Sequence, residues 1–581
     1  MKKIFKNKLL VFSVVLSSMI LVFACKDSFL EVPPAGQLSG GQLVTKAGIE
    51  GLLIGAYSLI NGRGTWYSSS FNWVQGGVLG GDANKGSNNG DQQGLQPIER
   101  FEVTPTNFES GSKWKACYEG ISRCNQVLQY LAKADASVSA ADKQRISGEA
   151  RFLRGHYYFE LKKVYNNTPY VDETLDYGTG IEKVPNNVDL WPKIEADFTY
   201  AAANLPETQS AAGRANSWAA KTYLAKTLLY QKKFADAKTL FTTVIASGQT
   251  TNGKKYALVA NFTNEFNASF SNSSESVFAN QAAANTGSTN NANNDFVLNF
   301  PYNTGANGPG GCCGFNQPSF DLVNSYRTDA KGLPLLDGSY NLPTNAVKND
   351  QGLLSKDPFT PDAGNLDPRL DFSVGRRGIP YLDWQDHPGQ DWIRDQAFSG
   401  PYAPKKFVYY KSQTGTLTDG SSWTPGYTAV NYDVLRFADV LLMAAECEVE
   451  VGSLETARAY VNTVRKRAAN PAAFVSKNGK AAANYVIGTY DTPFTDQAFA
   501  RNAVRFERRL ELSGEGQRFF DLVRWGVADK VVNAYLQFEG KILSNQLGGT
   551  TFKAGKNEYL PIPQAQIDLQ GSDILKQNPG Y

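Results

Sequence analysis

The sequence predicts a mostly α-helical protein in which paired helices form a scaffold for a large, irregular, loop-rich lobe. Three observations support this prediction. Apolar residues recur at helical spacing over much of the chain before residue 250. A helical pair from that part recurs in altered form after residue 430. The stretch between the two pairs is rich in Asn, Ser and Gly.

The first 24 residues have the pattern of a secretory signal. Lysines precede an apolar stretch from Leu9 to Phe23, which is shorter than the roughly 20 residues that a membrane-spanning helix needs. Ala24 and Cys25 follow, and a small residue before a cysteine resembles a bacterial lipobox. We expect residues 1–24 to be removed, and Cys25 to carry a lipid. An ordinary signal peptide with an incidental cysteine is the alternative.

The clearest helix is expected at residues 142–165. One apolar stripe at helical spacing consists of Ile146, Ala150, Leu153, Tyr157, Leu161 and Val164. Asn and Pro residues at 166–169 then end the helix. His156 lies beside these core positions, and we expect it to be packed in the interior.

Two helical pairs are expected, at residues 214–247 and after residue 430. The stretches AKTLLYQKKFADAKTLFTTVI and AECEVEVGSLETARAYVNTVR align without gaps. Ala225 and Ala237 match Ala445 and Ala457, and these small residues let antiparallel helices approach closely. The pairing resembles tetratricopeptide repeats, split by an insertion of about 180 residues; such pairs stack and bury a shared face. A generic helical hairpin is the alternative.

The stretch at about 250–430 differs from its surroundings. It contains one short strand-like run, Ser276 to Ala279, among long loops. Such loops are usually functional or disordered, and the many aromatic residues here argue against disorder. We therefore expect one domain at residues 25–581: a scaffold at about 40–250 and 430–530, an ordered irregular lobe between, and an extended tail at about 555–581.

Composition narrows the possible classes. The chain is 42% hydrophobic and 19% charged, which is ordinary for a globular protein. Its net charge of +3 argues against a nucleic-acid-binding protein, which needs a concentrated basic face. Cys117 and Cys124 lie about 10.5 Å apart on an expected helix, too far for a disulfide. Cys312 and Cys313 are adjacent, and either a bridge or two free thiols is possible.

No catalytic, metal or cofactor site is predicted. The chain has two histidines, His156 and His387, which make neither a zinc site nor a Ser-His-Asp arrangement. Glu507, Glu511 and Glu515 each have an arginine close in sequence, so ion pairing is expected rather than acid–base chemistry. We expect surface ion pairs of Glu511 with Arg508 and of Asp521 with Arg524.

Six segments carry a family resemblance. They are CKDSFLEVPP (25–34), EARFLRGHYYFELKKVYNNTPYV (149–171), FDLVNSY (320–326), YDVLRFADVLLMAAECEVEVGSLETARAYVNTVRKRA (432–468), RFERRLELSGEGQRFFDLVRWG (505–526) and EYLPIPQAQIDLQGSDILKQNPGY (558–581). In this order they resemble the SusD-like, or RagB, outer-membrane nutrient-binding lipoproteins. One departure is IDLQGSD (567–573), where the family pattern has Asn-Pro. The resemblance implies a SusD-like fold, an outer-membrane location facing the cell exterior, and a SusC-like TonB-dependent transporter as partner.

The family also implies a glycan ligand, bound by aromatic rings on variable loops. Sugars lay their C–H faces on rings, while Asn, Asp, Gln and Arg bind their hydroxyl groups. The candidates in this sequence are Trp66, Tyr67, Trp73, Asp82, Asn84, Tyr302, Phe315, Trp384, Trp392 and Trp423. The alternative for each ring is burial beneath a loop.

We therefore expect a lipoprotein, anchored through Cys25, that captures an oligo- or polysaccharide and delivers it to the transporter without cleaving it. Three alternatives remain open: a binder of peptides or protein fragments in the same role, a surface glycan-degrading enzyme, and an adhesin. The sequence does not identify the ligand, and it makes no prediction about a calcium ion in a loop.

Overall fold

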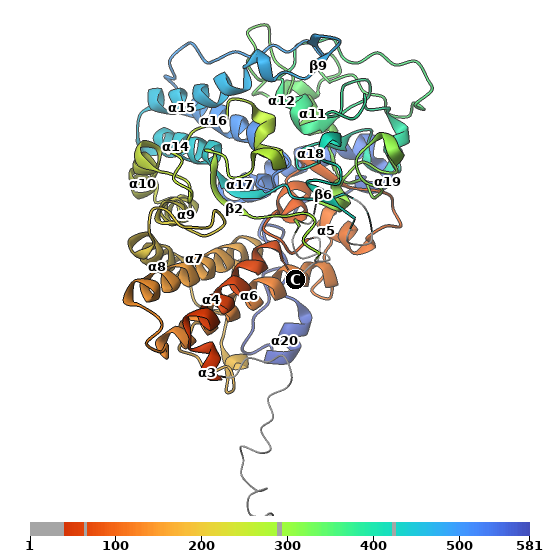
Figure 1. Ribbon diagram of the computed structural model, residues 1–581. Coiled ribbons are helices and arrows are strands. Elements are labelled where there is room, and N and C mark those ends of the chain that lie inside the picture. Colours follow the sequence, from red (N-terminus) through yellow and green to blue (C-terminus); the bar gives the residue numbers. More distant parts are fainter. Residues whose placement is uncertain (1–39, 63–66, 288–292, 295, 421–423, 425) are drawn as a thin grey trace, which may run out of the picture.

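The computed structural model describes residues 40–62, 67–287, 293–294, 296–420, 424 and 426–581. Figure 1 shows helices on one side of the molecule and a lobe of loops and short elements on the other. None of the helices in these ranges is both long enough and apolar enough to cross a bilayer. The expected signal sequence and Cys25 lie outside the described residues.

The amino-terminal half of the scaffold consists of four helices that pack in sequence. They are α4 (Lys46–Tyr57), α6 (Phe108–Ala132), α7 (Ala140–Tyr165) and α8 (Trp191–Asn204). Asn107 and Ser139 cap α6 and α7, because each side chain accepts a hydrogen bond from a free amide in the first turn. The predicted stripe on α7 is buried along its whole length, which confirms the helix at 142–165.

The two predicted helical pairs are present and lie against each other. The first is α9 (Ser217–Tyr230) with α10 (Phe234–Ser247), and the second is α14 (Phe437–Val451) with α15 (Leu454–Ala468). Helix α10 packs on α14 as well as on α9, so the two pairs stack although the loop-rich lobe separates them in sequence. Ala225, Ala237, Ala445 and Ala457 are all fully buried at the contacts between helices. The tetratricopeptide-like scaffold is thereby confirmed.

The lobe is ordered by short antiparallel strand pairs. β2 (Ser276–Asn280) pairs with β8 (Tyr432–Arg436), which leads directly into α14. β1 (Ala83–Gly86) pairs with β3 (Phe315–Pro318). The predicted run at Ser276 to Ala279 is thus a strand, and these pairings tie the lobe to the scaffold on both sides of its sequence.

The remaining elements are short, apart from the two helices α16 and α18. The other helices are α3 (Gly40–Leu43), α5 (Gln96–Glu99), α11 (Phe320–Ser325), α12 (Arg369–Ser373), α13 (Gln396–Ser399), α16 (Gln497–Leu512), α17 (Arg518–Arg524), α18 (Ala528–Ile542), α19 (Ser544–Leu547) and α20 (Gln564–Gln570). The other strands are β4 (Val374–Gly375), β5 (Ala403–Pro404), β6 (Thr418–Asp419), β7 (Tyr427–Thr428), β9 (Ser476–Lys477) and β10 (Lys480–Ala481). The prediction of an extended tail is wrong at α20, where the chain turns into a helix directly after Pro563.

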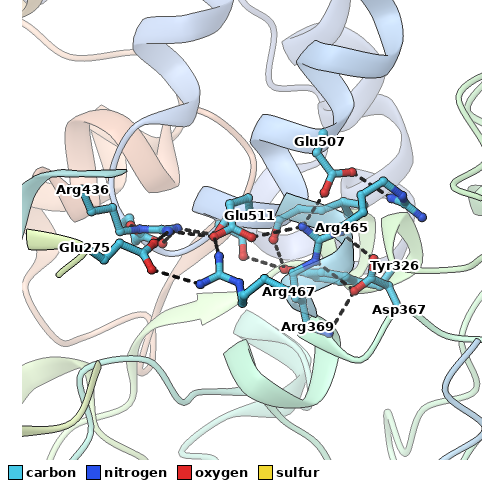
Figure 2. A network of polar contacts seen from close by, with 12 residues as sticks. Glu275, Tyr326, Asp367, Arg369, Arg436, Arg465, Arg467, Glu507 and Glu511 are labelled. Carbon is cyan, nitrogen blue, oxygen red and sulfur yellow. Dashed lines mark hydrogen bonds and ion pairs between the residues drawn. The ribbon is translucent and has the colours of Figure 1, made fainter. Parts of the chain in front are cut away.

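Buried ion pairs join scaffold and lobe. Glu511 on α16 contacts three guanidinium groups that come from α12, β8 and α15 (Figure 2); the three are Arg369, Arg436 and Arg467. The expected surface pair of Glu511 with Arg508 is wrong, because Arg508 instead binds Asp439 and Asp521 in the interior.

The predictions for the second ion pair and for the cysteines agree better with the structure. Asp521 pairs with Arg524 at 2.8 Å, although both side chains are buried rather than on the surface. Cys117 and Cys124 are buried and unbridged, as their spacing predicts. Cys312 and Cys313, which the sequence left open, form a disulfide.

Candidate functional site

Four of the aromatic candidates are core residues. Tyr67, Trp73, Phe315 and Trp392 have 6%, 1%, 0% and 3% of their surface exposed. Trp73 packs on Phe315 with ring centroids 6.1 Å apart, and Trp392 packs edge-on against Tyr381. These rings cannot form a ligand-binding surface in this structure, so their prediction as binding residues is corrected to a packing role.

Asp82 and Asn84 are also buried. Asp82 binds Arg509 at 3.2 Å, and burial raises the pKa of its carboxyl group despite that arginine. Asn84 donates a hydrogen bond to Glu539 at 3.0 Å and accepts one from the Tyr535 hydroxyl at 2.9 Å. Their polar groups thus bind other residues in the interior. The prediction that Asp82 and Asn84 bind a ligand is corrected to a structural role.

Two of the remaining four candidates are partly exposed in the structure. Trp66 and Trp423 lie outside the described residues. Tyr302 and Trp384 are half-buried and belong to the loop-rich lobe. They are therefore the predicted aromatic residues that remain partly exposed among those that the structure describes.

Tyr302 is held from two sides. Its backbone amide donates to the carbonyl of Trp392 at 2.9 Å. The guanidinium of Arg394 lies 5.2 Å from its ring centroid, a cation–π distance. Arg394 is itself fixed by an ion pair with Asp91 at 2.5 Å and a hydrogen bond to Ser87 at 3.0 Å.

Trp384 is held by Tyr409. Its indole nitrogen donates to the Tyr409 carbonyl at 3.1 Å, and the two rings meet edge to face with centroids 5.7 Å apart. The neighbouring Asp383 is exposed, and its carboxylate accepts hydrogen bonds from the backbone amides of Lys411 and Ser412. An oriented ring and a fixed carboxylate therefore lie side by side in the sequence and on the surface.

One glycine-rich loop links the two ring sites. The amide of Gly310 donates to the Tyr409 hydroxyl at 2.8 Å. The amide of Gly314 donates to the Phe300 carbonyl at 3.0 Å, and its carbonyl accepts from the Ser87 amide at 2.5 Å. The Cys312–Cys313 disulfide lies between these two glycines. We call Tyr302, Trp384, Tyr409 and Arg394, joined through loop 310–314, the ring cluster. Tyr409 is buried and holds Trp384 in place, so Tyr302 and Trp384 are the partly exposed rings of the cluster, beside charged and polar side chains.

Two members of the ring cluster, Arg394 and Tyr409, are not among the candidates predicted from the sequence. Arg394 has a weak signal, since it follows Trp392 in a stretch that contains Trp, Asp and Gln. Tyr409 follows a run of basic and apolar residues, and nothing in the sequence distinguishes it from a core tyrosine.

The titratable groups fit binding better than catalysis. Burial lowers the pKa of His156 to about 4 and, with Lys405 nearby, that of His387 to about 3, so both rings are neutral near pH 7. Glu507 and Glu511 are buried and paired with arginine side chains (Figure 2). Glu515 is also buried and pairs with Lys406 and Arg436. Within the described ranges, no group of three or more His, Cys, Asp or Glu side chains is arranged to hold a metal ion.

Two family models match consecutive parts of the chain. The model of the SusD family matches residues 274–581, which is more than half of the chain. A model described as "Starch-binding associating with outer membrane" matches residues 43–229. The first match covers most of the lobe and the carboxy-terminal part of the scaffold, and the second covers most of its amino-terminal part.

Curated relatives align over nearly the full length. SusD-like protein P2 of Formosa agariphila is 24% identical over 573 residues, covering 97% of this chain and 98% of that protein. A SusD-like protein of Bacteroides ovatus is also 24% identical, covering 100% of this chain and 96% of the relative.

Solved structures share the fold. A SusD superfamily protein from Bacteroides vulgatus gives a TM-score of 0.67 at 20% identity, over 92% of this chain and 99% of its own. Surface glycan-binding protein A from Bacteroides thetaiotaomicron, solved with laminarihexaose, gives 0.64 at 20% identity over 92% and 99%. A laminarin-binding SusD-like protein gives 0.62 at 24% identity over 92% and 100%. The expected fold is therefore confirmed.

Proposed function

The chain belongs to the SusD family, and from this membership we propose that it captures a glycan at the cell surface and does not cleave it. Two structural relatives support a carbohydrate ligand, since one is a laminarin-binding protein and another was solved with laminarihexaose. The proposed ligand class is an oligosaccharide or polysaccharide fragment.

The observation that carries this proposal is the ring cluster. Tyr302 and Trp384 are partly exposed aromatic residues whose orientations are fixed by Arg394 and Tyr409. Rings that are already oriented lose little conformational freedom when a sugar face packs on them. The exposed carboxylate of Asp383 and the polar groups around Arg394 then supply acceptors and donors for sugar hydroxyls.

The burial of the three glutamates considered in the sequence supports the proposal that the glycan is held without cleavage. Glycoside hydrolysis needs a pair of accessible carboxyl groups that flank the scissile bond. Glu507, Glu511 and Glu515 are each at most 5% exposed and neutralised by cations. Their roles are structural, and we propose that the loop surface binds its ligand by contact alone.

The location and the partner are also proposals. The lipobox-like Ala24–Cys25 step and the outer-membrane association in the description of the second matching model support a lipid anchor at Cys25 in the outer membrane. The family supports a SusC-like TonB-dependent transporter as the protein that receives the glycan. Intact mass measurement of the native protein tests the anchor, and co-purification from solubilised outer membranes tests the partner.

Calorimetry with a glycan panel tests the ligand. The mature chain without its anchor is titrated with laminarihexaose, a starch oligosaccharide and a peptide digest as the competing ligand class. We expect saturable binding to at least one glycan and none to the peptides. Binding to the peptides alone would replace the glycan with a peptide ligand, and new reducing ends after incubation would contradict the non-enzymatic role.

A further inference from the structure

An apolar groove runs along the first half of α6. It is formed by α6, by α20 and by the loop around Pro169 and Val171, and it consists of two adjoining hollows of about 290 and 320 Å³. Trp114, Lys115 and Gln566 line both hollows, so they form one continuous groove. We call it the α6–α20 groove. It is lined by residues other than those of the ring cluster.

Two strongly exposed apolar side chains lie at this groove. Leu569 and Phe108 are 71% and 67% exposed, and they are the most exposed large apolar side chains among the residues that the structure describes. Leu569 lines one hollow and Phe108 the other. Exposed apolar side chains around a groove are typical of a surface that binds another chain, a membrane or a ligand.

A segment of this chain has the right position to cover it. The described chain begins with α3, and Figure 1 shows α3 and α20 at the same end of the molecule. The amide of Asp135, just after α6, donates to the Val44 carbonyl at 3.1 Å, so the start of the described chain lies beside the last turn of α6. From there the groove is reached by following α6 back toward Trp114.

The length of the preceding segment matches this path. The rise of about 1.5 Å per residue puts Trp114 roughly 32 Å from the level of Asp135 along α6. The residues from Phe29 to Gly40 span up to roughly 36 Å when extended, at about 3.3 Å per residue. When the segment is fully extended, Phe29 therefore reaches the level of Trp114, which lines both hollows, whereas residues 32–34 extend no more than roughly 26 Å from Gly40.

The chemistry of the segment also matches the groove. SFLEVPP, residues 28–34, combines the apolar Phe29, Leu30 and Val32 with two prolines. Proline pairs favour an extended conformation that docks on aromatic surfaces. The half-buried Tyr118 ring supplies such a surface, and it packs on the buried Trp114 with ring centroids 4.9 Å apart.

The charges of the groove and of the segment also match. Lys115 is exposed at the junction of the two hollows, and its ammonium group lies 5.4 Å from the Phe108 ring centroid. Among the described residues no carboxylate is paired with it. Glu31 is the only charged residue of SFLEVPP, and it is the group that an ion pair with Lys115 requires.

We propose that residues 28–34 bind in the α6–α20 groove of their own chain, with apolar side chains in the two hollows and Glu31 beside Lys115. This docking does not depend on lipidation. Where Cys25 carries the proposed lipid, however, three peptide steps separate the anchor from Ser28. The groove end of the body is then held within roughly 10 Å of the membrane surface. The groove would thus set the orientation of the protein on the membrane.

Photo-crosslinking of the full mature chain tests this proposal. A photoreactive benzoylphenylalanine replaces Leu30, and crosslinked peptides are mapped by mass spectrometry. We expect crosslinks within one chain to residues 105–118 or 563–570. Crosslinks that map mainly elsewhere would overturn the proposal. A mixture of isotope-labelled and unlabelled protein distinguishes crosslinks within one chain from crosslinks between two chains. Crosslinks between labelled and unlabelled chains, with a yield that rises with protein concentration, would overturn the proposal and assign the groove to a second copy.

A pair of surface variants provides the matched control. Leu569→Asp places a charge on the groove rim, and Leu342→Asp does the same at another leucine that is 54% exposed. Both side chains are on the surface, so both variants are expected to fold. Leu569→Asp should lower the crosslink yield at least fivefold, whereas Leu342→Asp should leave it unchanged. Equal yields in the two variants would overturn the proposal.

Discussion

The Oε1 atom of Glu511 lies 2.7 Å from Nη1 of Arg436, and both side chains are inaccessible to solvent. Glu511 belongs to α16, and Arg436 is the last residue of β8, the strand that pairs with β2 of the lobe. Arg369 and Arg467 contact the same carboxylate (Figure 2). Burial alone raises the pKa of Glu511, but these guanidinium groups outweigh it, and the net pKa is lowered. One carboxylate thus joins three segments that are distant in sequence.

The first prediction concerns this junction. Glu511→Gln should lower the free energy of unfolding by about 3–5 kcal/mol, because it removes the one counter-charge that three buried guanidinium groups share. Urea denaturation measures the change. The control is Glu455→Gln, which removes an ion pair with Arg458 on the surface of α15 and should change the free energy of unfolding far less, because exposed ion pairs contribute little. Equal effects of the two substitutions would mean that the buried network contributes little to stability.

The second prediction concerns pH. Burial lowers the pKa of His156 to about 4, against an ordinary value of about 6.5. Between these values the unfolded state binds more protons than the folded state. The stability that neutral His156 contributes is therefore complete above pH 6.5 and is lost as the pH falls toward 4. Carboxyl groups whose pKa is raised have the opposite effect on stability as the pH falls. Glu539 is one of them, because burial raises its pKa to about 7.

A comparison of the wild type with His156→Gln separates these effects, since both proteins contain the carboxyl groups whose pKa is raised. Gln can still bond to the hydroxyl groups of Ser70 and Tyr223, which contact the imidazole. The stability of the wild type relative to the variant should fall by about 2.5 kcal/mol between pH 7 and 4.5. Denaturant titrations at several pH values measure it. A difference that stays constant over this range would show that His156 does not titrate as its burial requires.

The third prediction concerns the close approach of α9 and α10. Ala237 on α10 is fully buried, so Ala237→Leu should destabilise the protein by about 1–3 kcal/mol through overpacking. Ala235→Leu, two residues earlier on the exposed face of the same helix, should change stability by no more than about 0.5 kcal/mol. Thermal unfolding followed by circular dichroism compares them. If Ala237→Leu were tolerated as well as Ala235→Leu, the two helices could separate without cost.

The scaffold was predictable because its signals are local. The stripe on α7 repeats every three or four residues, and Ala225 and Ala237 recur as Ala445 and Ala457 in the second pair. These patterns are properties of one helix or one hairpin, so a single sequence contains them. The stacking of the second pair on the first was predictable for the same reason, since each pair has an apolar face that it cannot bury alone.

The candidate site was less predictable, because burial of a loop residue depends on distant segments. Trp73 lies in a glycine-rich stretch that resembles an exposed loop, yet it is covered by Phe315, more than 200 residues away. Glu511 has Arg508 one turn before it, yet its partners are Arg369, Arg436 and Arg467. Spacing in the sequence cannot distinguish a ring on the surface from a ring beneath another loop.

The last prediction tests the ring cluster as the binding surface. Tyr302→Ala removes a half-buried ring that stacks on Arg394, whereas Tyr302→Phe keeps the ring and removes only the hydroxyl group. If sugar faces pack on this ring, the alanine variant should bind the preferred glycan of the panel at least tenfold more weakly, which corresponds to about 1.4 kcal/mol. The phenylalanine variant should stay within about threefold of the wild type, or about 0.7 kcal/mol.

Phe499→Ala provides the matched control at a distant aromatic residue. Phe499 lies on α16 of the scaffold and is 44% exposed, so its loss removes a surface ring without touching the ring cluster. Calorimetry gives the affinities, and thermal unfolding shows that all three variants are folded. Unchanged affinity in Tyr302→Ala, with binding intact in the wild type, would move the glycan site away from Tyr302 while leaving the proposed function standing. Equal losses in Tyr302→Ala and Phe499→Ala would instead indicate a general loss of structure rather than a local contact.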